Sequence, residues 1–181
     1  ASGALAQDSI TVAIQLEPTN LDPTGGAAQA IDSVLYANVI EGLTRFASDG
    51  EIVRGLAQSW RISDDGLTYT FNLAAGVTFH DGTTMDAEDV KFSLDRARAE
   101  DSTNAQKGLF AGITEVSVID PLTVQATLDQ PNGNFLFNMA WGDAVIVAPE
   151  SIENIASNPI CTGPFTFTDW VQGDRLELTR N

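Results

Sequence analysis

The chain has 181 residues, 43% of them hydrophobic and 19% charged, a composition typical of one folded domain or two small ones. Its 25 acidic and 9 basic residues give a formal net charge of −16. This charge argues against nucleic-acid binding, which needs clustered Lys and Arg, and against adhesion to anionic membranes. No apolar run approaches the ~18 residues of a membrane-spanning helix, so we expect no membrane insertion.

The first third of the chain alternates between short regular segments and loops. We expect residues 1–9 to be a signal remnant or a tag, because positions 4–6 have the small-x-small pattern of a signal-peptidase site. Residues 10–15 alternate apolar with polar side chains and predict a strand. After a loop rich in Pro, Asp and Asn, residues 27–40 carry apolar side chains near helical spacing and predict a helix. A short hairpin is expected at residues 43–53.

The middle of the chain has the densest pattern. Residues 58–62 and 67–73 alternate as strands do, and the sequence SDDG between them predicts a hairpin turn. Asp86 is placed to cap a helix, and Asp89, three residues later, would complete a capping box. The helix itself is expected to bury Val90 and other apolar residues that follow.

The last third predicts further strands and a helix. Residues 113–119 and 122–128 alternate cleanly and predict an antiparallel pair. Residues 144–148 form an apolar run typical of a buried strand, and residues 149–156 predict a helix that begins at a proline. A final hairpin is expected at residues 165–179.

These same residues carry a resemblance to a known family. Between residues 55 and 94, the order LAQSW, SDDGLTYTFNL, GVTFHDGT and AEDVKFSL resembles the signature region of family 5 extracytoplasmic solute-binding proteins. These proteins are the peptide, opine and nickel receptors of ABC importers. Further matches are EPTNLDP after the first expected strand, VIEGL at residues 39–43, and NPICTGPF at residues 158–165, where Cys161 stands in place of the usual glycine.

The resemblance implies an α/β fold of the periplasmic-binding-protein-like class, type II. Full family members are far longer and clamp the ligand between two lobes, so the chain is expected to be a first lobe with the second lobe missing. The implied organisation is discontinuous. Residues 10–46 and 162–181 would share the first-lobe sheet, and residues 47–161 would form an inserted β-rich subdomain with helices.

The search for catalytic chemistry is negative. The sequence has no phosphate-binding loop, no GxGxxG, no GxSxG elbow and no HExxH. The sole histidine, His80, is better explained as part of a turn than as a general base, and a hydrolase built on Asp81 or Glu88 has little support. Cys161, the only cysteine, is expected to fill a tight turn. We therefore expect no enzyme, no cofactor and no metal site.

The first candidate ligand-binding segment is the loop at residues 17–22. It follows the first expected strand, and the resemblance places it at the mouth of the ligand cleft. Glu17, Thr19 and Asn20 would offer a carboxylate, a hydroxyl and an amide to a polar ligand. The alternative is that Asn20 and its neighbours only stabilise turns.

Two further candidates lie later in the chain. Trp141 and Asp143 belong to a loop between an apolar helical turn and a buried run, and the resemblance places the matching loop near the ligand. A packed loop without ligand contact is an equal alternative for them. Thr162 and Gly163 lie where the chain returns towards the first-lobe sheet, and their backbone is a weaker candidate for ligand contact.

The function implied by the resemblance is capture of a small polar solute, such as an oligopeptide or an opine, in the periplasm. Two lobes would close on the ligand, and an ABC permease would recognise the closed state. The alternative is a module that docks a permease or a sensor without needing ligand.

Overall fold

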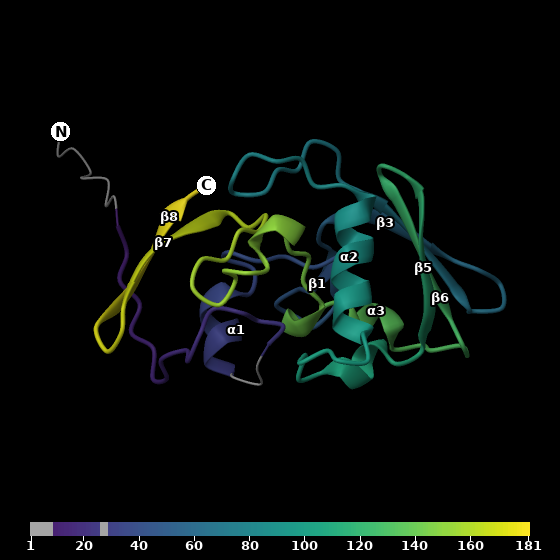
Figure 1. Cartoon of the computed structure of the whole chain (residues 1–181). Helices are drawn as coiled ribbons and strands as arrows, with labels where there is room; N and C mark the ends of the chain where they lie inside the picture. The colour runs from purple at the N-terminus through teal and green to yellow at the C-terminus, as the bar shows by residue number, and fades with distance from the viewer. Residues whose placement is uncertain (1–8, 26–28) are drawn as a thin grey trace.

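The structure is a computed structural model that describes residues 9–25 and 29–181. Figure 1 shows a sheet-and-helix region at one end of the molecule, and helix α1 with the β7–β8 hairpin at the other. The α-helices are α1 (Gln29–Leu35), α2 (Ala87–Arg98) and α3 (Phe135–Asn138). The strands are β1 (Thr44–Phe46), β2 (Ile52–Arg54), β3 (Ala57–Ile62), β4 (Thr68–Leu73), β5 (Ile113–Asp120), β6 (Thr123–Leu128), β7 (Phe165–Val171) and β8 (Arg175–Arg180). Short 3-10 turns are η1 (Lys107–Phe110), η2 (Gly142–Ala144) and η3 (Pro149–Ser151).

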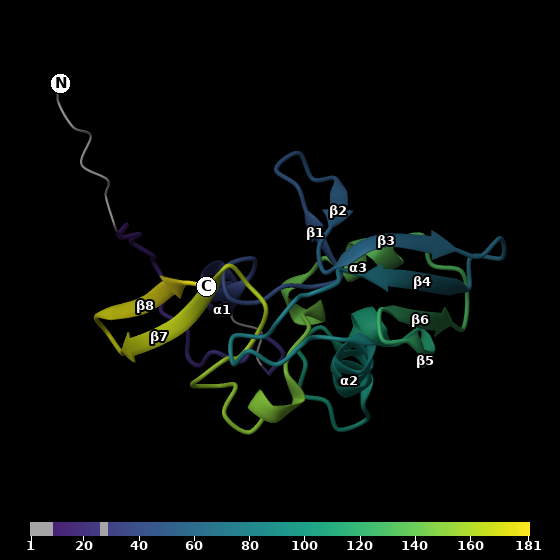
Figure 2. The ribbon, with the colours of Figure 1, turned by 90° about the horizontal axis from the view of Figure 1, so that it is seen from above.

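The larger region is built on a four-stranded antiparallel sheet in the order β3-β4-β6-β5. Alternate residues of β4 and β6 are buried, as the period-2 pattern predicts, and Phe71 pairs with Val124 in the centre. Helix α2 packs against β5 and β6 (Figure 2). The predicted strand pairs 58–62 with 67–73 and 113–119 with 122–128 are confirmed.

Helix α2 begins where the sequence predicts. The backbone amide of Glu88 donates to the Asp86 carboxylate at 2.8 Å, and the Asp86 amide donates to the Asp89 carboxylate at 2.8 Å. The predicted capping box is therefore confirmed, and it satisfies two of the free amides of the first turn. The buried face of the helix includes Val90 and Leu94.

The molecule has two hydrophobic cores. The first core lies between the four-stranded sheet, α2 and α3, and includes Phe71, Phe110 and Phe135. The second core lies beneath α1 and is formed by Leu21, Ile31, Val34, Leu35, Val39, Ile40, Val145, Val147, Ile155 and Cys161. The β7–β8 hairpin packs on the second core through partly buried residues such as Trp170 and Leu178.

The predicted strand at residues 10–15 is wrong. These residues are extended but pair with no strand, and the apolar side chains of Ile10 and Val12 are 84% and 71% exposed. Likewise β1 pairs with β2 and β7 with β8, each as a two-stranded sheet, so residues 10–46 and 162–181 do not share a sheet in the described structure. They share the second core instead. The division of the chain into subdomains stays a prediction.

Three other segments are less regular than their patterns predict. Helix α1 ends at Leu35 because Ala37 takes a φ of 60°, which ends helical hydrogen bonding. Residues 144–148 are buried, but they make only one bridge, between Val145 and Gly42. Residues 149–156 form the single turn η3 followed by i→i−3 turns. The start of the predicted 27–40 helix and residues 1–8 lie outside the described residues.

Candidate ligand-binding site

The chain joins its two cores through residues 41–43, which we call the bridging segment. On one side, the Ile146 amide donates to the Glu41 carbonyl at 2.9 Å. On the other, the Leu56 amide donates to the Gly42 carbonyl at 2.9 Å. Because the bridging segment accepts backbone hydrogen bonds from both sides, Glu41 is held in a fixed place between the cores.

Thr162 lies against this segment. It is 8% exposed, and its hydroxyl donates to the Glu41 carboxylate at 3.1 Å. Burial raises the pKa of Glu41, while the Thr162 hydrogen bond and the charge of Arg45 act in the opposite direction. The sequence interpretation did not include Glu41 among the candidates. The signal that could have found it is a single carboxylate inside the apolar run VIEGL.

Gly163 is a close-packing position. A Cβ there would lie 2.4 Å from the Asn38 carbonyl oxygen, so only glycine is accommodated without a shift of the backbone. Its amide donates to the Val39 carbonyl at 3.0 Å, and its carbonyl accepts from the His80 ring at 3.0 Å. Both backbone groups of Gly163 are thus already engaged inside the protein.

His80 connects the first core to this corner of the molecule. Its ring nitrogen Nε2 contacts the Gly163 carbonyl, which only accepts, and Nδ1 contacts the Cys161 amide at 3.4 Å, which only donates. The ring therefore carries its hydrogen on Nε2. The HDGT sequence forms the predicted turn, because the Asp81 carboxylate accepts from the Thr83 amide and Gly82 has a φ of 87°. The link to Gly163 was not predicted.

Trp141 lies at the surface, with 40% of its area exposed. It forms an aromatic cluster with Phe46 and Phe137, whose ring centres lie 6.3 Å and 6.1 Å from its own in edge-to-face arrangements. The cluster holds the indole in place while part of it faces solvent. An exposed aromatic fixed in this way provides a flat apolar surface for a ligand.

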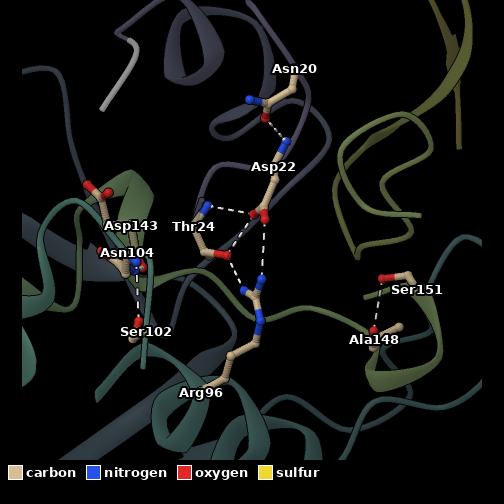
Figure 3. Close-up of polar contacts among 9 residues, drawn as sticks. All are labelled: Asn20, Asp22, Thr24, Arg96, Ser102, Asn104, Asp143, Ala148 and Ser151. Atoms are coloured by element: carbon tan, nitrogen blue, oxygen red, sulfur yellow. Dashed lines mark hydrogen bonds and ion pairs between the residues drawn. The ribbon is translucent and has the colours of Figure 1, made fainter. Parts of the chain in front are cut away.

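Asp143 is buried two residues further on, in η2. Only 7% of the residue is exposed, and its backbone carbonyl accepts from the Asn104 side chain at 3.0 Å. Burial, and then the charge of Asp32, raise the pKa of Asp143 to about 6. In Figure 3 the Asp143 carboxylate points away from Asn104 and Ser102. The loop is packed, as the alternative interpretation predicted, yet it buries an ionisable group.

The loop at residues 17–22 is held by contacts of its own. The Glu17 carboxylate accepts from the Trp170 indole at 2.9 Å and from the Gly173 amide at 2.7 Å, which ties it to the β7–β8 turn. Asn20 accepts from the Asp22 amide at 2.8 Å, which is the turn role that the alternative interpretation gave it. Thr19 is exposed.

Beyond Asn20, the same loop is fastened to α2. Arg96 donates to both Asp22, at 3.2 Å, and the Thr24 hydroxyl, and the Asp22 carboxylate also accepts from the Thr24 amide (Figure 3). The ion pair is largely shielded from solvent. Arg96 of helix α2 thus fixes the loop that carries Glu17, Thr19 and Asn20.

The predicted site residues therefore fall into two groups. The bridging segment contacts Thr162 directly and, through its bridge to Val145, lies next to the segment that carries Trp141 and Asp143. Glu17, Thr19 and Asn20 belong to the separately held loop. The groups provide carboxylates, hydroxyls and an aromatic surface, which suit reversible binding of a polar solute. Cys161 does not provide a nucleophile, because it is fully buried and burial raises its pKa.

Comparison with known proteins agrees with this description. Residues 51–181 match the family model described as bacterial extracellular solute-binding proteins, family 5 middle. The chain is 34% identical to the glutathione-binding protein GsiB of Salmonella paratyphi A over 181 residues, which cover 98% of this chain and 35% of that protein. It is 35% identical to GsiB of Pectobacterium atrosepticum, covering 99% of this chain and 36% of the relative.

Solved structures give the same result. NikZ from Campylobacter jejuni, in complex with Ni(L-His), superposes with a TM-score of 0.86 at 30% identity, over 98% of this chain and 36% of NikZ. DppA from Helicobacter pylori, in complex with the peptide STSA, superposes with a TM-score of 0.79 at 28% identity, over 90% of this chain and 37% of DppA.

The fold is thus α/β and periplasmic-binding-protein-like, as in the solved structures that it matches. The chain belongs to the bacterial extracellular solute-binding proteins of family 5. It spans about a third of the length of the relatives it matches, which is consistent with a single lobe. Within residues 9–25 and 29–181, no helix has the length and apolarity needed to cross a membrane.

Proposed function

We propose that the chain is the ligand-binding first lobe of a periplasmic ABC-transporter solute-binding protein, and that it captures a small polar solute such as an oligopeptide or an opine. The observation that carries the proposal is the loop of Trp141 and Asp143. It combines a fixed, 40% exposed indole with a buried carboxylate beside the bridging segment. Its relatives include a glutathione-binding protein and a peptide complex, which supports a ligand of peptide character.

The mechanism that we propose is binding without chemical change. The Trp141 surface and nearby polar groups would form one wall of a cleft, and a second lobe would close over the solute. Closure would create the form that an ABC permease recognises, because the ligand stabilises that form over the open one. No catalytic step is proposed, since the two groups best placed for it, His80 and Cys161, are engaged in packing and hydrogen bonding.

Isothermal titration calorimetry on the 181-residue chain tests the proposal with three probes: glutathione, a dipeptide and an opine. We expect weak but saturable binding of at least one probe, because one wall of a cleft makes only part of the contacts. Trp141→Ala should abolish the signal. Phe165→Ala is the matched control, because Phe165 is similarly exposed, at 37%, on strand β7.

Two results would contradict the proposal. One is the absence of saturable binding for all three probes. The other is retention of a cognate permease in pull-down regardless of added probe and of the Trp141→Ala change, which would favour a docking module that needs no ligand.

A further inference from the structure

A cavity beside the first core uses none of the residues of the candidate ligand-binding site. It has a volume of about 280 Å³ and lies among the start of β5, the end of β6, η1 and the loop that leads from β6 to α3 (Figure 1). Ligand pockets for drug-sized molecules begin at about this volume. The cavity therefore suits a small solute rather than an oligopeptide.

The floor of the cavity is apolar and fixed. Ile113, Leu128 and Phe135 line it, and each of them is at most 5% exposed because each belongs to the first core. The Phe135 ring also packs against the ring of Tyr69, with 4.5 Å between the two ring centres. A rigid apolar floor of this kind can support the C–H face of a ligand.

Backbone hydrogen bonds hold the walls of the cavity. The Asp129 amide donates to the Gly112 carbonyl at 2.9 Å, which joins the segment before β5 to the segment after β6. The Asn132 carbonyl accepts from the Tyr69 hydroxyl at 2.9 Å and from the Phe135 amide at 3.1 Å. Since the walls are fixed before any ligand arrives, binding does not have to order them.

Three polar side chains of the lining keep hydrogen-bonding capacity for a ligand. Asp129 and Gln130 are exposed, and no hydrogen bond joins either side chain to another described residue. The Asn132 side-chain oxygen accepts from the Asn134 amide at 2.9 Å, which leaves its NH₂ group as a donor. The Asp129 carboxylate lies over Gly112, where a Cβ would be 3.2 Å from its Oδ1 atom. The lining thus combines acceptors with donors.

The charges around the cavity narrow the chemistry of the ligand. Asp129 is the only charged group among the described lining residues, so an anion is disfavoured. The cations of adjoining elements have other acceptors, because Lys107 donates to the Glu100 carbonyl at 2.6 Å and Arg98 pairs with Asp95 at 2.7 Å. A lone organic cation gains little either, since ion pairs with an exposed carboxylate are weak. A hydroxyl group both donates and accepts, which matches the mixed lining.

We propose that this cavity is a second binding site, for a polyhydroxylated solute of the size of a monosaccharide. The Asp129 carboxylate accepts from neighbouring hydroxyls, and the Gln130 and Asn132 amides donate to oxygens of the ligand. The C–H face of the sugar ring rests on the apolar floor. The inference is independent of the proposed function, because the two sites share no residue. A free monosaccharide and the terminal residue of a glycan offer the same ring chemistry, which the test separates.

The test uses nuclear magnetic resonance of the ¹⁵N-labelled 181-residue chain, titrated with D-glucose, D-galactose and D-mannose. Cyclohexanol, a six-membered ring with one hydroxyl, is the control probe. We expect saturable shifts of the Gly112 and Asp129 amides with at least one hexose, with a Kd on the order of millimolar, and none with cyclohexanol. A methyl glycoside of that hexose that binds equally well indicates the end of a glycan, and loss of binding indicates a free monosaccharide.

One pair of variants tests the role of the carboxylate. Asp129→Ala should weaken hexose binding at least about tenfold, because it removes a charged acceptor. Asp64→Ala removes the same charge from an exposed turn and should leave binding unchanged. Both positions are exposed, so both variants should keep the fold, and their unshifted spectra check this.

Three outcomes would overturn the inference. These are the absence of saturable shifts with all three hexoses, equal shifts with cyclohexanol or with n-butylammonium chloride, and hexose binding that survives Asp129→Ala. Failure here is distinguishable from failure of the proposed function. If glutathione, a dipeptide or an opine binds through Trp141 while no hexose binds, the second site is wrong and solute capture stands. If a hexose binds at Asp129 while none of those three probes binds, the reverse holds.

Discussion

The two cores of this chain are built in different ways. The first has a four-stranded sheet whose strands are joined mostly by close pairs in the sequence, covered by a capped helix of twelve residues. The second has a helix of seven residues, a two-stranded hairpin and a segment at residues 10–16 whose apolar side chains face solvent. A two-stranded hairpin is marginal without further packing. Local sequence patterns were therefore sufficient to predict structure where the packing partners are near in sequence, and insufficient where the partners are distant.

The largest expected effect lies in the first core. Phe71→Ala should lower the free energy of unfolding by about 3–5 kcal/mol, because Phe71 is fully buried in the centre of the sheet. Urea denaturation followed by circular dichroism measures it. Phe137→Ala, at a side chain 44% exposed, should cost less than about 1 kcal/mol. Equal losses would show that the sheet is not the stable part of the molecule.

The junction with the second core should be next in sensitivity. Gly163→Ala should cost about 1–3 kcal/mol, because the added methyl group meets the backbone of residues 38 and 39 rather than a movable side chain. The matched control is Gly133→Ala, where the added Cβ meets nothing within 4 Å, and its effect should be near zero. Thermal unfolding of both variants measures the difference. A neutral Gly163→Ala would mean that the junction adjusts freely.

Replacing the buried carboxylate of Asp143 should stabilise the protein, whereas the changes at Phe71 and Gly163 destabilise it. The size of this stabilisation depends on pH. The folded-state pKa of Asp143 is about 6, above its ordinary value of 3.8. Between these two pH values the folded protein keeps a proton on Asp143 that the unfolded chain has lost. Stability should therefore fall as pH rises from about 4 to about 6 and then level off. Asp143→Asn should remove this fall and raise stability at pH 7 by about 1–2 kcal/mol. Urea denaturation at pH 4, 5, 6 and 7 measures it, and parallel curves for the two proteins would refute the assignment.

The smallest effect concerns the fastening between the two regions. Arg96→Ala removes the partly buried ion pair with Asp22 and the bond to Thr24, and should cost about 1 kcal/mol. Arg175→Ala removes three ion pairs, all about half exposed, and should cost about 0–0.5 kcal/mol. Hydrogen exchange should show the Arg96→Ala loss at residues 17–25 and not in β4 or β6. Loss spread evenly over the chain would contradict a local role.

The fold was predictable where side-chain period and local caps decide it. The α2 capping box and the β5–β6 pair follow directly from neighbouring residues. The prediction of a strand at residues 10–15 failed because alternating apolar and polar side chains show only that one face is apolar. The alternation does not supply a neighbouring strand. The predicted length of α1 was wrong because the left-handed conformation of Ala37 depends on the hydrogen bond from its amide to the Ile40 carbonyl, not on helix propensity.

The candidate site was predictable only in part. Trp141 and Asp143 were found because an aromatic and an acid in a loop are unusual enough to notice. Glu41 and the His80 link to Gly163 were missed, because each depends on a partner about 80 or more residues away that no local pattern reveals. The resemblance to the family supplied the fold class and the expected function, which periodicity alone did not.

The lone cysteine at position 161 makes the second core separately measurable. Cys161 is fully buried there, and it is the only thiol in the sequence. A thiol reagent can therefore modify the chain only when this core opens, whatever the state of the sheet. The modification rate under native conditions, divided by the rate for the unfolded chain, gives the opening equilibrium of that half of the molecule. Cys161 therefore serves as a native probe of how often the second core opens.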